Sequence, residues 1–464
     1  MKAHMLHNTL ARIDSAVEGP ALERLFELVC IPSISADPAY ADDCRKAAEY
    51  CAGQLNEIGF EASVRKTIGH PMVVGHYKGA GEGRPHILFY GHYDVQPVDP
   101  LELWDNPPFE PKVAGEGGKA KILGRGSSDD KGQFMTFFEA ARALMEETGA
   151  LPVNVTILLE GEEESASPSM VPFLKENAEE LKADIAFVCD TGMWDADTPA
   201  IATRLRGLLY EELFVEGPSH DLHSGHYGSA ARNPIHVLAK LLADLRDDDG
   251  RIQIPGFYDG VKELTAEEKA EWESLGFDEK AFMDEIGLSL PAGEKGYSAL
   301  EQTWARPTAE VNGIIGGYTG EGGKTVIPSK ASAKISFRLV GEQDPDKIRE
   351  AFYAFVRERI PADCKVAFKS HGGEGAITQP SDSDWVKTSL KALSEEWGKE
   401  AKLTAMGGSI PIVAQFKRIL GLDTVLVGFA LDDDRIHSPN EKYNLKSFHG
   451  GARSWARILC ALGK

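Results

Sequence analysis

The order of apolar and polar positions in the first two hundred residues predicts alternating helices and strands. Residues 41–58 place apolar side chains at helical spacing, and a second helix is expected over residues 131–147. Continuous apolar runs at residues 86–90, 153–159 and 185–189 are typical of strands that are buried on both faces. This part of the chain therefore predicts an α/β layer structure.

The pattern changes near Arg204, where "RLRGLLYEELFVEG" predicts one long strand. A helix is expected over residues 234–245, a charge-rich helical stretch over 261–285, and an alternating strand over 334–340. The remaining expected elements here are a strand around Val311, a helix over residues 345–357 and a strand near Lys365. Strands and helices in this order predict an α+β domain.

The alternating pattern returns after the glycine-rich "SHGGEGAITQP". The expected elements are helices over residues 382–397, 410–419 and 446–462 and a strand over 424–427. The expected fold class is thus α/β: a discontinuous domain, residues 1–207 and 379–464, has a mixed sheet flanked by helices. An α+β domain, residues 208–378, is inserted into it.

The composition excludes several classes of binding partner but does not identify the function. Among 464 residues, 72 acidic and 50 basic side chains give a net charge of −22, which argues against nucleic-acid and membrane partners. No apolar run approaches the ~20 residues of a membrane span, and the N-terminus lacks the apolar core of a signal peptide, so we expect a cytoplasmic protein. The six cysteines form no Cys-x-x-Cys pair and predict neither disulfides nor a thiolate zinc site.

Histidines and carboxylates follow several of the predicted strands. In "FYGHYDVQP", His92 and Asp94 are two apart, so Asp94 can orient the imidazole while its other nitrogen faces a metal. A histidine at a strand end that is merely packed or solvated is the plainer interpretation. "VCDTG" ends another strand with Asp190, and "DDDRIHSPNEKYN" supplies His437 after the strand at 424–427. Ligands gather at the carboxyl ends of parallel strands, which favours a common site.

Two further motifs are acidic. "GRGSSDDKG" carries Asp129 and Asp130 immediately before a helix, where they serve either as N-caps or as a carboxylate that bridges two cations. "LLEGEEES" places Glu160, Glu163 and Glu164 directly behind an apolar strand, although adjacent glutamates on a loop are most often solvated charge. Two histidines with several carboxylates and no cysteine favour a pair of zinc, manganese or cobalt ions and two-metal hydrolysis.

With these motifs together, the chain resembles the co-catalytic zinc peptidase family of carnosinase-like cytosolic dipeptidases, glutamate carboxypeptidase and succinyl-diaminopimelate desuccinylase. "YGHYDVQP", "GRGSSDDKG", "EGEEES", "DLHSG", "KTVIP", "SFRLV", "GGSIP" and "IHSPNEK" carry the resemblance and span residues 90–443. The first and last of these motifs are most similar to the dipeptidase branch. The resemblance implies a zinc-peptidase catalytic domain and a ferredoxin-like lid through which the chain forms a homodimer.

The resemblance also implies roles for the acidic and histidine residues. Asp129 is expected to bridge two divalent ions, most simply Zn²⁺, with Mn²⁺ or Co²⁺ as alternatives. Glu163 is the expected general base, which removes a proton from a metal-bridging water. In the family pattern Glu162 is the variable position, and we expect it to be solvated. The expected remaining ligands are His92 and Asp190 for one ion and Glu164 and His437 for the other. Asp94 is expected to orient His92.

Residues of the inserted domain are expected to contact the substrate. The resemblance assigns oxyanion stabilisation to His223, from its own or the partner subunit, and leaves His220 and His226 without a role. Pro218, Gly225 and Gly228 predict a loop there rather than a metal-binding helix. The other implied substrate contacts are Thr325, Arg338 and Ser409, with His437 shared between metal and substrate. The plainer interpretation of Arg338 is a solvent-facing position on an alternating strand.

The function predicted from these motifs is a two-metal dipeptidase or exopeptidase that acts on small peptides with a free C-terminal carboxylate. An N-acyl-amino-acid deacylase or desuccinylase would use the same metal core and is the alternative enzyme. A metal-loaded scaffold without catalysis is the non-enzymatic alternative, and it is disfavoured because competent residue types fill every expected metal position and that of the base.

Overall fold

A computed structural model describes the backbone of residues 2–464 and the side chains of residues 4–464. The chain forms two compact units. Unit 1 comprises Met1–Thr203, Gln379–Thr404 and Gln415–Lys464, and unit 2 comprises Arg204–Thr378 and Ala405–Ala414. The short segment Ala405–Ala414 therefore belongs with unit 2. From the sequence it was expected to belong to the discontinuous domain, as part of residues 379–464.

Unit 1 is built on a mixed sheet with strand order β1-β2-β6-β3-β7-β17-β8. The central strands β6, β3, β7 and β17 run parallel, and antiparallel strands flank them. The sheet strands of this run are β1 (Glu61–Arg65), β2 (Met72–Tyr77), β3 (His86–His92), β6 (Asn154–Glu160), β7 (Ile185–Val188), β8 (Ala200–Leu205) and β17 (Thr424–Val427). The mixed α/β sheet that the sequence predicts is thereby confirmed.

Helices and short strands complete unit 1. The helices are α1 (Lys2–Ala16), α2 (Pro20–Val29), α3 (Ala41–Ile58), α4 (Lys131–Thr148), α5 (Met170–Glu176), α12 (Asp384–Trp397) and α14 (Leu445–Leu462). A separate three-stranded sheet consists of β4 (Lys112–Ala114), β5 (Lys121–Leu123) and β18 (Lys442–Asn444). Strand β16 (Lys402–Met406) pairs with β8. Strand β15 (Ile377–Thr378), whose residues belong to unit 2, pairs with Arg204 and Leu205 at the end of β8, which belong to unit 2 as well.

The two faces of the central strand β3 are both buried, as its continuous apolar run predicts. Phe89 points to one side, where its ring packs edge-on against Trp455 of α14 and stacks on Phe137 of α4. Tyr90 points to the opposite side and packs edge-on against Phe416. Because neighbouring strand residues face opposite ways, a strand covered on both faces shows no polar alternation.

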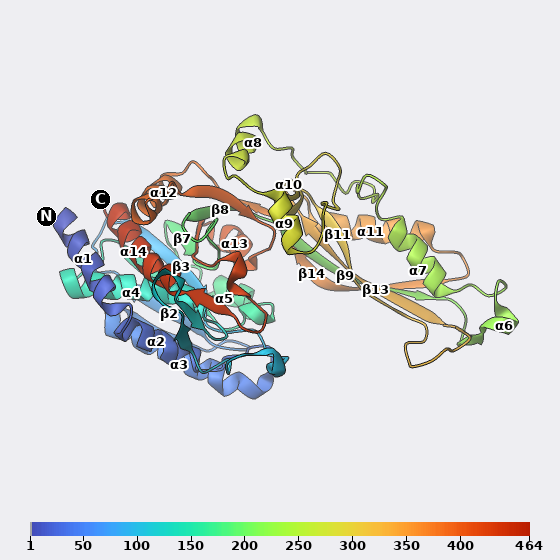
Figure 1. Cartoon of the computed structure of the whole chain (residues 1–464), viewed down its shortest axis with the longest axis horizontal. Helices are drawn as coiled ribbons and strands as arrows, with labels where there is room; N and C mark the ends of the chain where they lie inside the picture. Colours follow the sequence, from blue (N-terminus) through green and yellow to red (C-terminus); the bar gives the residue numbers. More distant parts are fainter. Residues whose placement is uncertain (1) are drawn as a thin grey trace. The chain divides into compact units, whose positions relative to one another are not determined.

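Unit 2 contains a four-stranded antiparallel sheet in the order β11-β13-β9-β14, packed against α7 and α11 (Figure 1). Its elements along the chain follow the β-α-β-β-α-β order of a ferredoxin-like sandwich. These elements are β9 (Gly207–Glu216), α7 (Pro234–Ala243), β11 (Thr308–Gly316), β13 (Lys330–Leu339), α11 (Pro345–Arg359) and β14 (Lys365–Glu374). Alternating buried and partly exposed positions along β9 and β13 explain the period of two in their sequences.

Short elements of unit 2 depart from the sequence predictions. The charge-rich stretch expected as one helix over 261–285 forms two, because the loop between them contains Gly276 at a φ of 66°. The helix expected over 410–419 begins at Pro411 and continues as a wider π-helical turn. The remaining elements are β10 (Leu222–His223), α6 (Ser224–Tyr227), α8 (Ala266–Glu273), α9 (Glu279–Glu285), α10 (Ala299–Trp304), β12 (Val326–Ile327) and α13 (Pro411–Gln415).

Candidate active site

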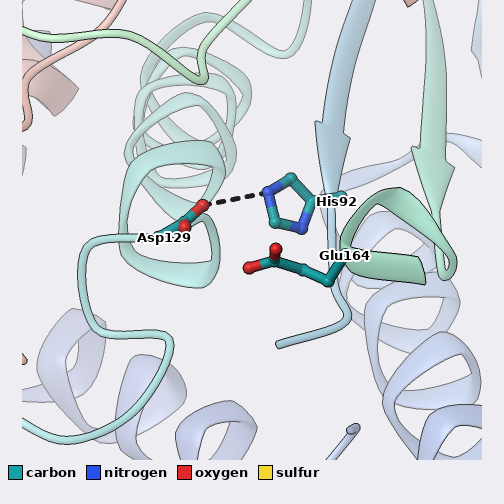
Figure 2. Close-up of side chains that lie close together, drawn as sticks. All are labelled: His92, Asp129 and Glu164. Carbon is teal, nitrogen blue, oxygen red and sulfur yellow. Dashed lines mark hydrogen bonds and ion pairs between the residues drawn. The ribbon is translucent and has the colours of Figure 1, made fainter. Parts of the chain in front are cut away.

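The candidate metal ligands of unit 1 lie where strands of the parallel sheet end. His92 is the last residue of β3, Asp190 follows β7 by two residues, and Glu164 lies in a short turn after β6. Asp129 directly precedes the N-cap residue of α4, and His437 lies in the loop after β17. One possible ligand atom from each of His92, Asp129 and Glu164 lies within 4.8 Å of the other two (Figure 2). The chain thus brings together residues from five separate segments.

The Asp129 carboxylate lies between two histidines. Its Oδ1 is 3.1 Å from Nε2 of His92, and its Oδ2 is 2.9 Å from Nε2 of His437. The same His437 nitrogen is 3.2 Å from Oε2 of Glu164, and His92 Nε2 is 4.0 Å from Oδ2 of Asp190. Each oxygen of Asp129 therefore faces a different histidine, and the Nε2 atom of each histidine faces one further carboxylate.

Asp94 is completely buried and holds three segments of the site together. Its carboxylate accepts hydrogen bonds from the backbone N–H groups of Glu163 at 3.2 Å and Glu164 at 3.0 Å. It also accepts the hydroxyl of Ser35 at 2.6 Å. Nδ1 of His92 lies 3.4 Å from the Asp94 carboxylate but 3.1 Å from its backbone carbonyl oxygen. The carbonyl is therefore the closer partner of His92, while the carboxylate mainly positions the two glutamates.

The adjacent acidic residues occupy unlike environments. Glu160 is fully buried and accepts the Tyr90 hydroxyl at 2.6 Å, and burial raises its pKa to about 7. The expectation that Glu162 is solvated is wrong: its side chain is buried and accepts the backbone N–H groups of His70 at 2.8 Å and Ser169 at 3.0 Å. Asp130 occupies the N-cap position of α4, but its carboxylate accepts the backbone N–H of His92 instead of capping the helix.

Burial and mutual repulsion dominate the electrostatics of this site. Burial raises the pKa of Glu163 well above its usual value, and the neighbouring Asp190 and Glu164 raise it further. The pKa of Asp190 rises to about 7, first through burial and then through the charge of Asp129. The pKa of Glu164 is also raised, again by burial and by Asp129. Several carboxylates confined in this way are stabilised by cations.

Two predicted substrate contacts lie together in unit 2. The guanidinium of Arg338, on β13, donates from Nη1 to the Ser409 hydroxyl at 3.3 Å. Arg206 lies beside the same loop and donates from Nε to the Gly407 carbonyl at 2.8 Å. Burial and, after it, the nearby positive charge of Arg338 together lower the pKa of Arg206 to about 10. Among residues 4–464, no carboxylate lies within ion-pair distance of Arg206 or Arg338.

The other two predicted contacts, His223 and Thr325, lie together elsewhere in unit 2. Strand β10, which contains His223, pairs with β12, and the N–H of Ser224 donates to the Thr325 carbonyl at 3.0 Å. Strand β12 joins the Lys330 end of β13, whereas Arg338 is near its opposite end. At about 3.3 Å per residue, the eight residues between these ends span roughly 26 Å. The predicted contacts therefore form two separate groups within one copy of unit 2.

The histidines around His223 make local contacts only. Its ring accepts the N–H of Gly225 at 3.0 Å and stacks on His226 with ring centroids 4.5 Å apart. Nδ1 of His220 lies 2.9 Å from the Ser219 hydroxyl. The segment predicted as a loop contains the short strand β10 and the single turn of α6.

Three side chains beside the candidate residues have no role in the sequence predictions. Gln96 donates to Oε2 of Glu164 at 2.6 Å, Glu441 accepts the N–H of Asp129 at 3.1 Å, and Arg206 lies beside Arg338. Gln96 and Glu441 stand inside the quoted motifs "YGHYDVQP" and "IHSPNEK". Their position in these motifs was the signal that could have identified them.

The sequence model for peptidase family M20/M25/M40 matches residues 88–461. The chain belongs to this family. It is 30% identical to the Cys-Gly metallodipeptidase DUG1 of Candida albicans over 96% of this chain and 94% of that protein. It is 28% identical to the human Beta-Ala-His dipeptidase over 96% of this chain and 90% of that protein. The predicted membership of the dipeptidase branch of M20 peptidases is confirmed.

Solved structures extend this M20 similarity to the whole fold. The structure of the dipeptidase Dug1p from Saccharomyces cerevisiae has a TM-score of 0.84 at 27% identity and covers 99% of this chain and 98% of its own. The metallo-carboxypeptidase Sso-CP2 from Sulfolobus solfataricus has a TM-score of 0.84 at 31% identity, with 96% and 99% coverage. The predicted enzyme class, a metallopeptidase hydrolase of the dipeptidase type, is confirmed. Within residues 2–464, every helix is too short or too polar to cross a membrane.

Proposed function

We propose that this M20 peptidase is a two-metal dipeptidase that hydrolyses small peptides with a free C-terminal carboxylate. The observation that carries the proposal is the placement of Asp129, whose two carboxylate oxygens face His92 and His437 at 3.1 and 2.9 Å. A carboxylate that offers one oxygen to each of two histidines has the arrangement required of a bridge between two cations.

The donor set fits divalent ions of the zinc, manganese or cobalt type, because it combines imidazole with carboxylate and contains no thiolate. Burial and the charge of Asp129 raise the pKa values of Glu164 and Asp190, so a bound cation would stabilise the ionised form of both carboxylates. Such ions, when bound, polarise the scissile carbonyl and ease the deprotonation of water. The ligands we propose are His92, Asp129 and Asp190 for one ion, and Asp129, Glu164 and His437 for the other.

Glu163 is the residue we propose as general base. Its backbone N–H is held by Asp94, and its side chain lies among the carboxylates whose charges raise its pKa. It takes up the proton of the attacking water and then delivers it to the leaving amine. Asp94 fixes the positions of Glu163 and Glu164 relative to each other, because one carboxylate accepts both of their N–H groups.

Arg338 and Ser409 are proposed to bind the terminal carboxylate of the substrate. A guanidinium can donate two parallel hydrogen bonds to a carboxylate, and Arg338 has no ionic partner among the described residues. The nearby Arg206 adds a second positive charge. Both features favour a substrate that carries an anion.

His223 and Thr325 are proposed to act from the partner subunit of a homodimer. They lie at the end of β13 opposite Arg338, too far along the sheet to reach the same dipeptide within one copy of unit 2. Strand β11 is an edge strand of that sheet, and its region exposes Ile314, Ile315 and Tyr318. An exposed apolar edge strand is a surface on which a second copy can associate.

The expected substrates are small dipeptides, as the names of the Cys-Gly and Beta-Ala-His dipeptidases indicate for those relatives. The alternative N-acyl-amino-acid deacylase would use the same metal core. A panel of Cys-Gly, β-Ala-His and Ala- or Gly-containing dipeptides, measured beside N-acetyl and N-succinyl amino acids with Zn²⁺, Mn²⁺ or Co²⁺, separates the two. Turnover of the acylated compounds alone would contradict the dipeptidase proposal.

The adjacent glutamates provide the first test of the site. We expect Glu163→Gln to retain about two ions per chain and to lose at least ~10²-fold in kcat, the scale for removal of a general base. The matched variant Glu164→Gln should bind less metal, because it removes a ligand. Metal analysis and dipeptide kinetics of both proteins check this contrast. Unchanged turnover in Glu163→Gln would remove that residue from the role of base.

A further inference from the structure

Glu441 is a buried carboxylate that lies four residues after His437, with an exposed fraction of 1%. Its Oε2 accepts Nη1 of Arg125 at 2.8 Å and the N–H of Gly126 at 3.0 Å. Its Oε1 accepts the N–H groups of Ser128 at 2.9 Å and Asp129 at 3.1 Å. Three of its four donors are thus backbone groups of the loop that ends at Asp129.

One chain segment therefore contacts Asp129 in two ways. His437 lies 2.9 Å from the Asp129 carboxylate, while Glu441 accepts the backbone N–H of the same aspartate. The backbone position of Asp129 is consequently linked to the segment that carries His437. A displacement of either loop would change the distance between these two proposed ligands.

Two neighbouring interactions hold the same pair of loops. Strand β18 begins directly after Glu441 and pairs with β5, which ends directly before Gly124. The Gly124 N–H also donates to the Glu441 carbonyl at 3.1 Å. Asp434, fully buried, accepts the Ser128 hydroxyl at 2.7 Å and lies 2.6 Å from Nζ of Lys442. Glu441 therefore lies between β18 and the loop that carries Asp129, and it contacts that loop through both its backbone and its side chain.

Arg125 extends the connection to a third loop. Its guanidinium donates to the Pro97 carbonyl at 3.1 Å and lies 5.2 Å from the centre of the Trp104 ring. Pro97 belongs to "YGHYDVQP", the motif that contains His92. The buried pair of Arg125 and Glu441 thus joins the loops that carry His92, Asp129 and His437. Among residues 4–464, Glu441 is the carboxylate that contacts Arg125.

We propose that Glu441 is a positioning residue of the metal centre. Its carboxylate fixes the Asp129 loop against the His437 segment, so that Asp129 presents one oxygen to each histidine. This inference rests on the metal site proposed above. Residues that support metal ligands in this way typically contribute 10–100-fold to metal affinity.

Glu441→Gln tests the proposal, because it retains the length of the side chain but replaces one accepting oxygen with an NH₂ group. In either orientation that group would face two N–H donors, so one pair of hydrogen bonds is lost. We expect Zn²⁺ and Co²⁺ affinity to fall by about 10–100-fold, measured by competition with a chelating indicator. The visible absorption spectrum of the Co²⁺ protein should also change, and excess metal should partly restore kcat.

Glu211→Gln is the matched control in unit 2. Glu211 is also fully buried and accepts Arg349 at 2.9 Å, Tyr353 at 2.6 Å and Ser370 at 2.7 Å. This variant should lower the unfolding temperature and leave Zn²⁺ and Co²⁺ affinity unchanged. The control separates loss of a buried carboxylate network from loss of ligand positioning.

The outcomes are distinguishable from one another. If Glu441→Gln binds both ions with wild-type affinity and an unchanged Co²⁺ spectrum, the proposal is wrong, even if the protein is less stable. If Glu441→Gln fails to fold, Glu441→Asp replaces it, because the shorter acid keeps the charge opposite Arg125 but cannot reach all four donors. It should also bind metal more weakly, and wild-type affinity would overturn the proposal. A wild-type protein that binds no divalent ion would instead contradict the proposed function.

Discussion

The two units hold their candidate functional residues in different ways. In unit 1, five segments bring candidate ligands into one cluster, in which Asp129 lies about 3 Å from each of two histidines. In unit 2, the candidate residues lie in two groups at opposite ends of β13, with Arg338 in one and His223 in the other. The cluster in unit 1 comes from one chain, whereas the two groups of unit 2 are too far apart in one copy to meet at one substrate, which is why we propose that a second copy supplies one of them.

The difference follows from the geometry of the two sheets. Parallel strands joined through helices have their carboxyl ends at one edge, so residues that follow β3, β6 and β7 converge. In an antiparallel sheet, neighbouring strands begin and end at opposite edges, so residues at successive strand ends are separated by the strand length. Unit 1 can therefore assemble a metal site alone, and unit 2 offers contacts at two distant places.

The largest effect is expected for His223, the residue that we propose acts from the partner subunit. His223→Ala should lower kcat by on the order of 10²–10³, the cost of removing a donor to an oxyanion, with metal content intact. When it is mixed with Glu163→Gln under conditions of subunit exchange, half of the dimers are mixed. Each has one restored site, so about a quarter of wild-type activity should return. Steady-state kinetics of the mixture measures the recovery.

A matched mixture distinguishes this recovery from other causes. Glu163→Gln mixed with Glu164→Gln should remain inactive, because both changes affect the same site in unit 1 and no mixed dimer contains an intact one. If the His223 mixture also remains inactive after subunit exchange has been verified, His223 acts in its own subunit. Metal loss in His223→Ala would instead make it a ligand.

The sequence was informative where neighbours along the chain determine the outcome. Helix α3 has the predicted bounds, and β3, β6 and β7 lie in the predicted apolar runs. The sequence did not predict the burial of side chains that are covered by distant segments of the chain. Glu162 was expected to be solvated, yet the backbone of Gly69 and His70 closes over it, so closely that a Cβ on Gly69 would lie 1.7 Å from its Oε1. Nothing in "EGEEES" indicates that approach.

The candidate site shows the same limit. The motifs indicated His92, Asp129 and Glu164, which do cluster. They also contain Gln96 and Glu441, but only the hydrogen bonds across the fold show which residues these two contact. Single sequences also gave no measure of the separation between His223 and Arg338, because it depends on strand pairing.

A smaller effect is expected at the other end of the unit 2 sheet. Arg338→Lys keeps a positive charge but loses the paired donors, so KM for dipeptides should rise about tenfold, as expected for one charge-assisted hydrogen bond of about 1.5 kcal/mol. Lys334→Ala is the matched control, because Lys334 lies on the same strand and face of β13. It should leave KM unchanged.

The substrate provides the decisive comparison for Arg338. A dipeptide amide lacks the terminal carboxylate, so wild-type protein and Arg338→Lys should handle it with similar KM values. An equal rise in KM for the amide and the free acid would show that Arg338 supports the structure of unit 2 and does not recognise the carboxylate.

The smallest effect on catalysis is expected for Glu160, whose titration instead affects the stability of the metal-free protein. Its pKa in the folded state is about 7, mainly because the side chain is buried, and a free glutamate has a pKa near 4.3. Between these values the folded state binds more protons than the unfolded state, so this group makes stability fall as pH rises from about 4.5 to 7. Glu160→Gln removes the titration while its amide oxygen can still accept the Tyr90 hydroxyl. We expect urea unfolding to show that the free energy of unfolding of Glu160→Gln, relative to that of the wild type, is about 1–3 kcal/mol higher at pH 8 than at pH 5. Identical pH dependence in both proteins would mean that Glu160 is already ionised in the folded chain, and that unit 1 tolerates one more buried negative charge beside its proposed metal ligands.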